Sequence, residues 1–346
     1  MTGGPRGLPR LSETGRVSLM RRTGTILAND SLLLLTAVIW GLAFVAQRMG
    51  MDHIGPFTYN ALRFALGSLS LLPVILLRRR AGGASTAAGA ARVTASDAPP
   101  AGAAPAPQPA VQRGIGSLPA GLLAGGVLFL GASLQQAGLV STTAGKAGFI
   151  TGLYVVLVPL AGLLWGQRTS WSAWAGALLS VGGLFLLSVT DTFTMERGDL
   201  LVLIGAFCWT GHVQILGWLS PRTDPIRLSC VQFAVCSLGS AAAALLGEPA
   251  SMAGILAAAL PILYGGILSV GVAFTLQVVA QRRAPPAHAA ILLSLESVFA
   301  ALGGGLLLGE RLGARGVAGC AIMFAGMIIS QVPLIAVSLA GSRRRV

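Results

Sequence analysis

Charged residues are scarce in this sequence, and their scarcity indicates which solvent surrounds the chain. Only 10% of the 346 residues are charged, whereas 54% are hydrophobic, and the mean hydropathy is +0.77. A soluble domain of this length needs far more charge to cover its surface. The composition therefore predicts that lipid surrounds much of the chain, and it excludes an ordinary soluble protein.

The sequence also lacks the patterns that a metal centre, a disulfide framework or an active site needs. Its four cysteines stand inside apolar runs without C-x-x-C or Cys/His spacing, as expected of small core residues. No Walker motif, no H-E-x-x-H, no G-x-S-x-G and no histidine cluster is present. We therefore expect no cofactor, no metal and no enzymatic activity. An integral-membrane enzyme or a scaffold is kept as the alternative from a different class.

The net charge of +13 does not indicate a nucleic-acid-binding protein. The basic residues stand in short clusters between apolar runs, which is the pattern that sets membrane topology. We therefore expect the lipid bilayer and a small-molecule substrate as partners, and no nucleic acid.

Ten runs of the sequence are long and apolar enough to cross a bilayer, which takes about 20 residues. Most of the connections between them are short. The predicted spans are 31–49, 56–77, 118–139, 144–166, 170–189, 198–219, 225–247, 256–280, 285–308 and 313–338.

Three segments outside these runs have a different composition. Residues 1–28 carry five arginines and predict a disordered basic leader, and residues 340–346 form a basic cytoplasmic tail. Residues 78–116 are rich in Ala, Pro and Gly and have few large apolar residues, so they predict a disordered linker.

The distribution of Lys and Arg predicts the orientation of the chain. With the N-terminus inside, 18 of the 24 basic residues fall on cytoplasmic segments and four fall on the opposite side. This asymmetry follows the positive-inside rule. We expect a multi-pass protein of the inner (plasma) membrane with both termini in the cytoplasm.

The second half of the sequence repeats the first. At an offset of 169 residues, Trp40 and Pro56 recur as Trp209 and Pro225. At an offset of 143, the pattern G-L-L-x-G-x-R of residues 162–168 recurs at residues 305–311. The repeats are 29–189 and 190–339. Because each contains five predicted spans, the second must enter the membrane with opposite orientation. The predicted fold is an all-α integral membrane protein with ten transmembrane helices in two inverted five-helix repeats.

Four segments resemble the drug/metabolite transporter superfamily, specifically its EamA-like ten-helix branch. They are IWGLAFVAQR (39–48), NALRFALG (60–67), AGKAGFITGLYVVLVPLAGLLWGQR (144–168) and SLESVFAALGGGLLLGERL (294–312). The resemblance covers nearly all of the chain except 1–28 and 78–116. It implies export of a metabolite or drug, driven by protons or by exchange, with the fourth and ninth helices among those that line a central cavity.

The sequence leaves several functions open. The leading interpretation is a secondary active transporter that works by alternating access, proton-coupled or exchange-driven. The rival within transport is a flippase or exchanger for a lipid-linked or nucleotide-linked substrate. The G-x-x-x-G spacings permit close helix approach, in packing or in a homodimer.

Two ionisable residues deep inside predicted spans are the first candidates for the transport site. Glu296 is the only carboxylate deep in any span, and low dielectric favours its protonated form, so we expect a proton-coupling site or a cation ligand. A structural hydrogen bond to a neighbouring helix is the alternative. Arg63 is expected to pair with an anionic substrate or with Glu296, or to serve as a structural clamp.

For two further ionisable residues, a structural role competes with a role in transport. Lys146 begins the fourth span near the outer face, where its ammonium group reaches the interface by snorkelling. His212 lies one turn after Trp209 in the sixth span, and hydrogen-bonded packing is the more common role of such a histidine.

Aromatic and amide side chains complete the candidates. Trp40 and Trp209 hold equivalent repeat positions and are expected to wall a cavity or to anchor the helices. Tyr154 stands next to the repeat equivalent of Glu296. Gln135 and Gln136 in the third span are uncharged polar groups at membrane depth and are expected to face the same space.

Overall fold

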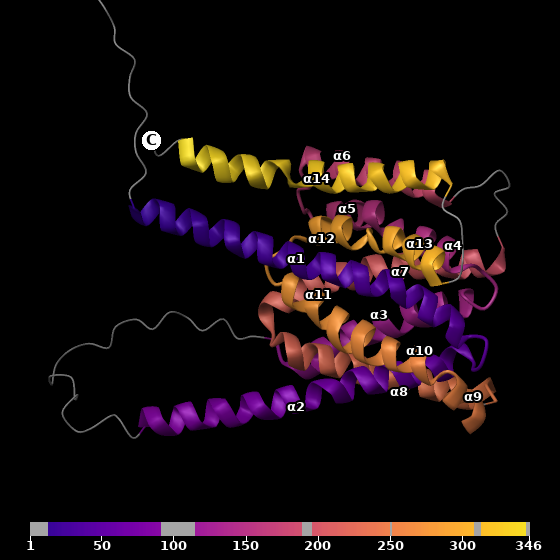
Figure 1. The fold of residues 1–346 in the computed structure, drawn as a ribbon. Coiled ribbons are helices and arrows are strands. Elements are labelled where there is room, and N and C mark those ends of the chain that lie inside the picture. Colours follow the sequence, from indigo (N-terminus) through magenta and orange to yellow (C-terminus); the bar gives the residue numbers. More distant parts are fainter. Residues whose placement is uncertain (1–12, 91–114, 189–195, 250, 308–312, 344–346) are drawn as a thin grey trace, which may run out of the picture.

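The computed structural model describes residues 13–90, 115–188, 196–249, 251–307 and 313–343, and in these residues every regular element is a helix. The helices of the first half are α1 (Glu13–Gly50), α2 (Pro56–Ala90), α3 (Ser117–Gly138), α4 (Ala144–Gly152), α5 (Tyr154–Leu164) and α6 (Trp171–Ser188). They lie roughly parallel or antiparallel to one another (Figure 1).

The second half has more, shorter helices. They are α7 (Arg197–Leu219), the single turn η1 (Ser220–Arg222), α8 (Pro225–Gly247), α9 (Met252–Ala257), α10 (Ala259–Leu263), the π-helix η2 (Tyr264–Phe274), α11 (Thr275–Ala280), α12 (Pro286–Leu293), α13 (Glu296–Leu307) and α14 (Ala314–Arg343).

Eight helical spans of the described residues are long and apolar enough to cross a membrane. They correspond to the predicted spans one to four and six to nine. The predicted fifth and tenth spans correspond to shorter apolar helices, 171–186 within α6 and 314–330 within α14. The chain is therefore a multi-pass helical membrane protein.

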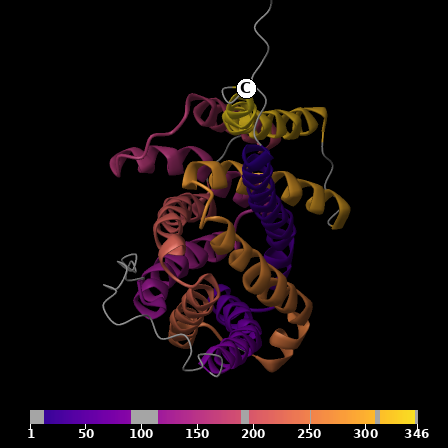
Figure 2. The ribbon, with the colours of Figure 1, turned by 90° about the vertical axis from the view of Figure 1, so that its left-hand side faces the viewer.

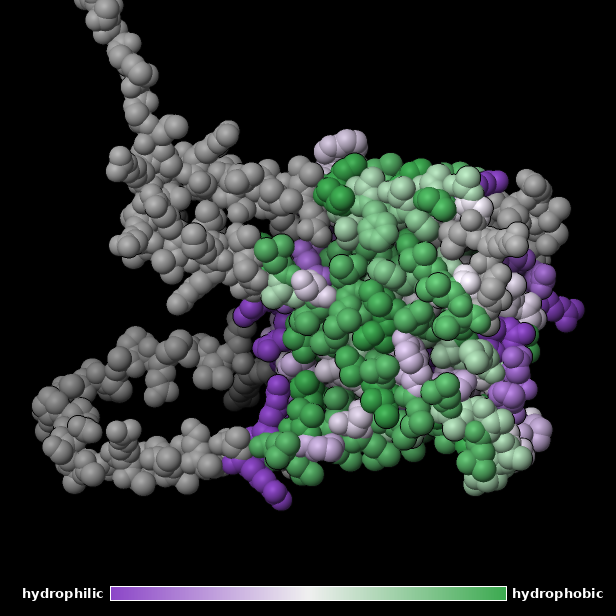
Figure 3. Space-filling model, in the orientation of Figure 1, coloured by the Kyte–Doolittle hydropathy of each residue, from purple (hydrophilic) through white to green (hydrophobic). Residues whose placement is uncertain are grey.

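The surface agrees with a lipid environment. Apolar side chains form a broad band across the middle of the molecule, and hydrophilic side chains gather at both of its edges (Figure 3). The α1 start and the α14 end lie at one edge, which we call the terminal face, and α4 begins at the other, the opposite face (Figure 1).

Burial separates central spans from peripheral ones. In the span Pro286–Leu307, 67% of the apolar window is buried inside the protein, whereas the value for Pro225–Gly247 is 22%. Viewed from the terminal face, α6 and α14 lie at one side of the bundle and α2 and α8 at the other (Figure 2). Lipid therefore covers the outer helices, and the fourth, eighth and ninth spans form the interior.

Helix starts follow from local sequence. Asp224 accepts a hydrogen bond from the Arg227 backbone N–H at 2.8 Å, with Pro225 in the first turn of α8. The Glu248 carboxylate, after α8, accepts the backbone N–H groups of Phe57 and Thr58 at 2.8 and 2.7 Å. This contact caps α2 from a distant part of the chain and ties the two peripheral helices together.

The helices α1 and α2 extend further than the apolar runs. They continue through residues 13–28 and 78–90, whose composition predicts a disordered leader and linker. An existing helix adds residues at little cost, and alanine and arginine favour it. Residues 1–12, 91–114 and 344–346 of the leader, linker and tail lie outside the described residues.

The helices α6 and α14 meet through glycines in a reciprocal way. A Cβ atom added at Gly176 would lie 2.7 Å from the Gly326 carbonyl oxygen, and one added at Gly183 would lie 2.5 Å from the Gly319 carbonyl oxygen. Gly176 and Gly183 correspond to Gly319 and Gly326 at the repeat offset of 143. Gly176 therefore contacts the repeat equivalent of Gly183, and Gly183 contacts the repeat equivalent of Gly176.

We predict that Gly176→Ala lowers the melting temperature of the purified protein in detergent. The new methyl group must push two backbones apart, which costs roughly 1–3 kcal/mol. Gly182→Ala on the same helix is the matched control, because no atom lies within 4 Å of its added Cβ, and alanine favours the helix there. Equal melting temperatures for the two variants would contradict the close contact.

Candidate functional site

Two central spans are interrupted at equivalent positions. The fourth span breaks at Leu153, between α4 and α5, and the ninth breaks at Ser294 and Leu295, between α12 and α13. At both breaks the backbone makes tighter i→i−3 hydrogen bonds, Leu153 N–H to Ile150 O at 3.2 Å and Leu295 N–H to Leu292 O at 3.3 Å. Irregular backbone at membrane depth is tolerated where protein or a cavity surrounds it.

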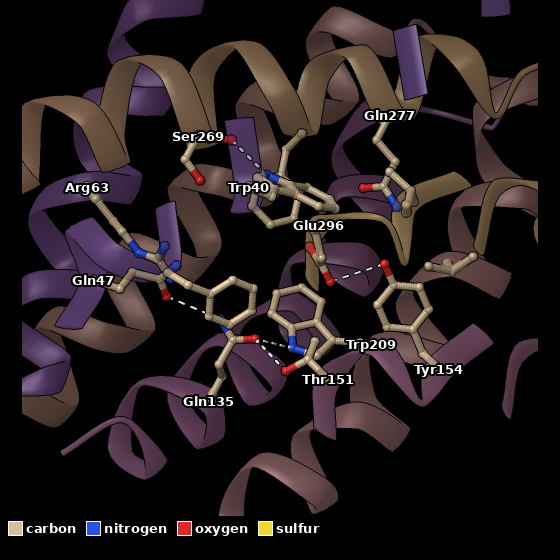
Figure 4. A pocket seen from close by; sticks show the side chains of 14 residues that line it. Trp40, Gln47, Arg63, Gln135, Thr151, Tyr154, Trp209, Ser269, Gln277 and Glu296 are labelled. Carbon is tan, nitrogen blue, oxygen red and sulfur yellow. Dashed lines mark hydrogen bonds between the residues drawn. The ribbon is translucent and has the colours of Figure 1, made fainter. Parts of the chain in front are cut away.

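The two breaks bring Glu296 and Tyr154 together. Glu296 is the first residue of α13 and is 3% exposed, and Tyr154 is the first residue of α5. The Tyr154 hydroxyl donates a hydrogen bond to Glu296 Oε1 at 3.2 Å. The only carboxyl among the pocket-lining side chains thus stands where the interrupted helices of the two halves meet (Figure 4).

A pocket surrounds this contact. Six of the nine predicted site residues line it. The lining consists of Trp40, Phe44, Gln47, Arg63, Gln135, Thr151, Tyr154, Trp209, Val213, Ser269, Phe274, Gln277, Leu293 and Glu296.

Aromatic rings form one wall of the pocket. The Phe274 ring lies 4.5 Å from Trp40 and 6.0 Å from Trp209, measured between centroids. The Trp40 indole N–H donates to the Ser269 carbonyl oxygen at 3.2 Å. That carbonyl belongs to the π-helix η2, whose wider turn is a common feature of functional sites. The wall offers apolar faces to a ligand, with the indole N–H groups already bonded.

Amide side chains form the wall toward the ends of α1 and α3. Gln135 Oε1 accepts the Trp209 indole N–H at 2.9 Å and the Thr151 hydroxyl at 3.5 Å, and Gln135 Nε2 donates to Gln47 Oε1 at 3.2 Å. This network links both halves of the chain. It presents neutral hydrogen-bonding groups beside the aromatic wall.

Arg63 lines the pocket without a carboxylate partner. The described residues place no carboxylate oxygen within 4.0 Å of its guanidinium group, and the side chain is 2% exposed. Its Nε donates to Asn60 Oδ1 at 2.9 Å, and its Cζ lies 4.8 Å from the Phe64 ring centroid. In this conformation Arg63 and Glu296 occupy one pocket as separate charges, and the expected ion pair between them is not formed (Figure 4).

Three predicted site residues lie outside the pocket lining. His212 is fully buried, and its Nε2 lies 3.0 Å from Gln232 Oε1. Gln136 Nε2 donates to the Gln47 carbonyl oxygen at 3.4 Å. Lys146 stands at the opposite face, 3.6 Å from an Asp199 carboxylate oxygen and 3.9 Å from Glu196. The alternative of hydrogen-bonded packing therefore describes His212.

Several lining residues were not predicted. Gln47 and Gln277 each stand shortly before an arginine, at 48 and 282, and were not among the candidates. Ser269 and Phe274 belong to η2, whose π-helical geometry has no signal in the apolar pattern. A single glutamine within a predicted span is the signal that would have found Gln47 and Gln277.

The chemistry of the pocket is that of binding. It combines one carboxyl group, one guanidinium group, three carboxamides and an aromatic wall. Among the described residues, no group of three His, Cys, Asp or Glu side chains is placed to hold a metal ion. With the helical bundle, the pocket defines a multi-pass membrane protein with a polar site among its central helices.

Comparison with known proteins gives the family. The sequence model of the EamA-like transporter family matches residues 28–189 and again residues 196–331. The chain belongs to this family, within the drug/metabolite transporter superfamily, as the sequence motifs predicted. Membership implies a small-molecule substrate and a membrane location.

Individual relatives agree. An uncharacterized transporter of Archaeoglobus fulgidus is 28% identical over 275 residues, covering 79% of this chain and 76% of that protein. A WAT1-related protein of Arabidopsis thaliana is 24% identical over 148 residues, covering 41% of this chain and 36% of that protein. A solved crystal structure with 19% identity superimposes with a TM-score of 0.65 over 88% of this chain and 97% of its own. That structure shares the fold.

We predict that Arg63 and Glu296 form no direct ion pair in the ligand-free protein. In a double-mutant cycle with Arg63→Gln and Glu296→Gln, the coupling in the free energy of unfolding should stay within the roughly 0.5–3 kcal/mol of side chains that share a cavity. Chemical or thermal unfolding in detergent measures all four proteins. A larger coupling would show that the two charges pair directly.

Proposed function

We propose that this chain is a secondary active transporter that exports a small metabolite or drug-like compound by alternating access, with Glu296 as the proton-coupling group. The observation that carries the proposal is the position of Glu296. A single carboxyl group lies in a central pocket, at the helix break of the ninth span, beside the Tyr154 hydroxyl.

A carboxyl group in this position is suited to exchange protons. Burial disfavours its charged form, and water or a polar substrate entering the pocket favours it, so occupancy and protonation are linked. Tyr154 donates a hydrogen bond that stabilises the charged form. The repeat equivalent of Glu296 is Leu153, so one half alone supplies this group.

The proposed architecture is ten spans in two inverted five-helix repeats. The family model matches the chain twice, once in each half. The reciprocal contacts of Gly176 with Gly326 and of Gly183 with Gly319 support a two-fold axis that exchanges α6 and α14. Alternating access in such proteins rocks one repeat against the other around a fixed central site.

The proposed orientation places the terminal face in the cytoplasm of a cell with an inner membrane. The exposed Arg222, Arg282 and Arg283 follow helices that end there, and the exposed Arg227 lies in the first turn of α8, which begins there. This excess of positive charge at one face supports both termini being cytoplasmic.

We predict that expression of the wild type raises one class of compound in the medium above the level of an empty-vector strain. Mass spectrometry of the medium identifies that class and, with it, the substrate. A profile equal to that of the empty vector would count against export and favour import or flipping of a lipid-linked substrate.

With the substrate identified, we predict that Glu296→Gln removes the dependence of transport on a pH gradient in proteoliposomes. Glutamine has nearly the same shape but cannot bind and release a proton in this range. Asp52→Asn is the matched control, because Asp52 pairs with Arg48 at an exposed helix end, 2.8 Å apart. Wild-type pH dependence in a folded Glu296→Gln protein would rule Glu296 out as the coupling group.

A further inference from the structure

Two acid–base pairs outside the pocket join the halves of the chain. Asp30 on α1 meets His288 on α12, with 2.8 Å between Asp30 Oδ1 and His288 Nε2. Asp199 on α7 meets Lys146 on α4, with 3.6 Å between Asp199 Oδ2 and Lys146 Nζ. In each pair one partner belongs to the first half and the other to the second.

The internal repeat relates the two pairs to each other. Asp199 follows Asp30 by 169 positions, the offset that also relates Trp40 to Trp209. His288 and Lys146 are each the third residue of their span, and the offset of 143 aligns them within one position. Each pair therefore joins the first span of one repeat to the interrupted fourth span of the other.

The two pairs lie at opposite edges of the bundle. Asp30 and His288 stand near the starts of the spans Ile26–Gly50 and Pro286–Leu307, which begin at the terminal face. Asp199 and Lys146 stand at the starts of α7 and α4, which begin at the opposite face (Figure 1). The pocket with Glu296 lies between them along the same helices.

Burial of at least one partner makes these pairs sensitive to opening. The side chains of Asp30 and His288 are each 11% exposed, and in the other pair Asp199 is 4% exposed and Lys146 is 33% exposed. Asp30 Oδ2 has no hydrogen-bond partner among the described residues. A buried polar group keeps such a contact because leaving it unpaired in the interior is costly, whereas partners that separate into an opened interface regain water. Such a contact holds an interface closed and lets it open at small net cost.

We propose that Asp30–His288 closes the pocket toward the terminal face and that Lys146–Asp199 closes it toward the opposite face, the two pairs separating in turn during transport. The inference rests on the alternating-access part of the proposed function. It does not depend on the identity of the substrate or of the coupling ion.

The test measures access to the pocket from each side. In a protein whose Cys208, Cys230, Cys236 and Cys320 are replaced by alanine, Ser269→Cys places one thiol in the pocket lining. A membrane-impermeant thiosulfonate reagent is applied to right-side-out and inside-out membrane vesicles. Arg283→Cys, in the exposed turn before α12, identifies which vesicles present the terminal face.

We predict that His288→Phe speeds labelling of the pocket thiol on the order of tenfold from the terminal face, and that Lys146→Met does so from the opposite face. Lys146→Met spares Asp199, which also accepts the Thr142 hydroxyl and the Glu196 backbone N–H. Asp52→Asn, which breaks an ion pair within a single repeat, should change neither rate.

Labelling that rises equally from both sides, rises from the wrong side, or stays unchanged in both folded variants would overturn the assignment. So would an equal effect of Asp52→Asn. If His288→Phe fails to fold, Asp30→Asn tests the same pair from its other partner. The readout needs no substrate and no gradient, so failure of proton coupling in Glu296→Gln leaves the gate assignment standing, and the reverse also holds.

Discussion

Hydrocarbon offers the backbone no hydrogen-bonding partner, and this constraint governs the whole structure. Every described element is helical because a helix satisfies its own N–H and C=O groups inside lipid. Departures from the helix are therefore costly in the periphery and occur in the protected interior. The fourth, eighth and ninth spans contain the breaks at Leu153 and Ser294 and the π-helix η2. Those departures surround the pocket, so the helix-breaking cost is concentrated where polar groups are needed.

The two halves share one framework but differ in the chemistry they place on it. Leu153 stands where the second half has Glu296, and Gln232 stands where the first half has Arg63. Gln232 points to His212 and away from the pocket lining, whereas Arg63 lines it. In the proposed alternating access, a symmetric frame lets the two halves exchange conformations. The asymmetric side chains give the pocket a single carboxyl group and a single guanidinium group. The pocket therefore holds one acidic and one basic group, instead of a symmetric pair of each.

The sequence predicted the parts that depend on apolar length and on charge. Eight of the ten predicted spans are helices long and apolar enough to cross a membrane, the family model matches each half, and six of the nine candidate residues line the pocket. Helix ends in water were not predictable, because residues 13–28 and 78–90 continue as helix without an apolar pattern. His212 was a candidate site residue but does not line the pocket, whereas Gln47 lines it without having been a candidate. The reason here is a different one. Which face of a helix meets the cavity depends on packing between distant spans, and neither periodicity nor polarity encodes that rotation.

The interrupted spans connect the pocket to the edges of the bundle. The ninth span carries His288 on α12 and Glu296 at the start of α13, and the fourth carries Lys146 on α4 and Tyr154 at the start of α5. In each span the break separates a residue of an edge pair from a residue of the pocket. In the proposed cycle, proton exchange takes place at the break of the ninth span while the edge pairs separate in turn. The hydrogen bond from Tyr154 to Glu296 joins the two breaks. The central carboxyl group and a partner of each edge pair therefore lie on two spans that are in direct contact.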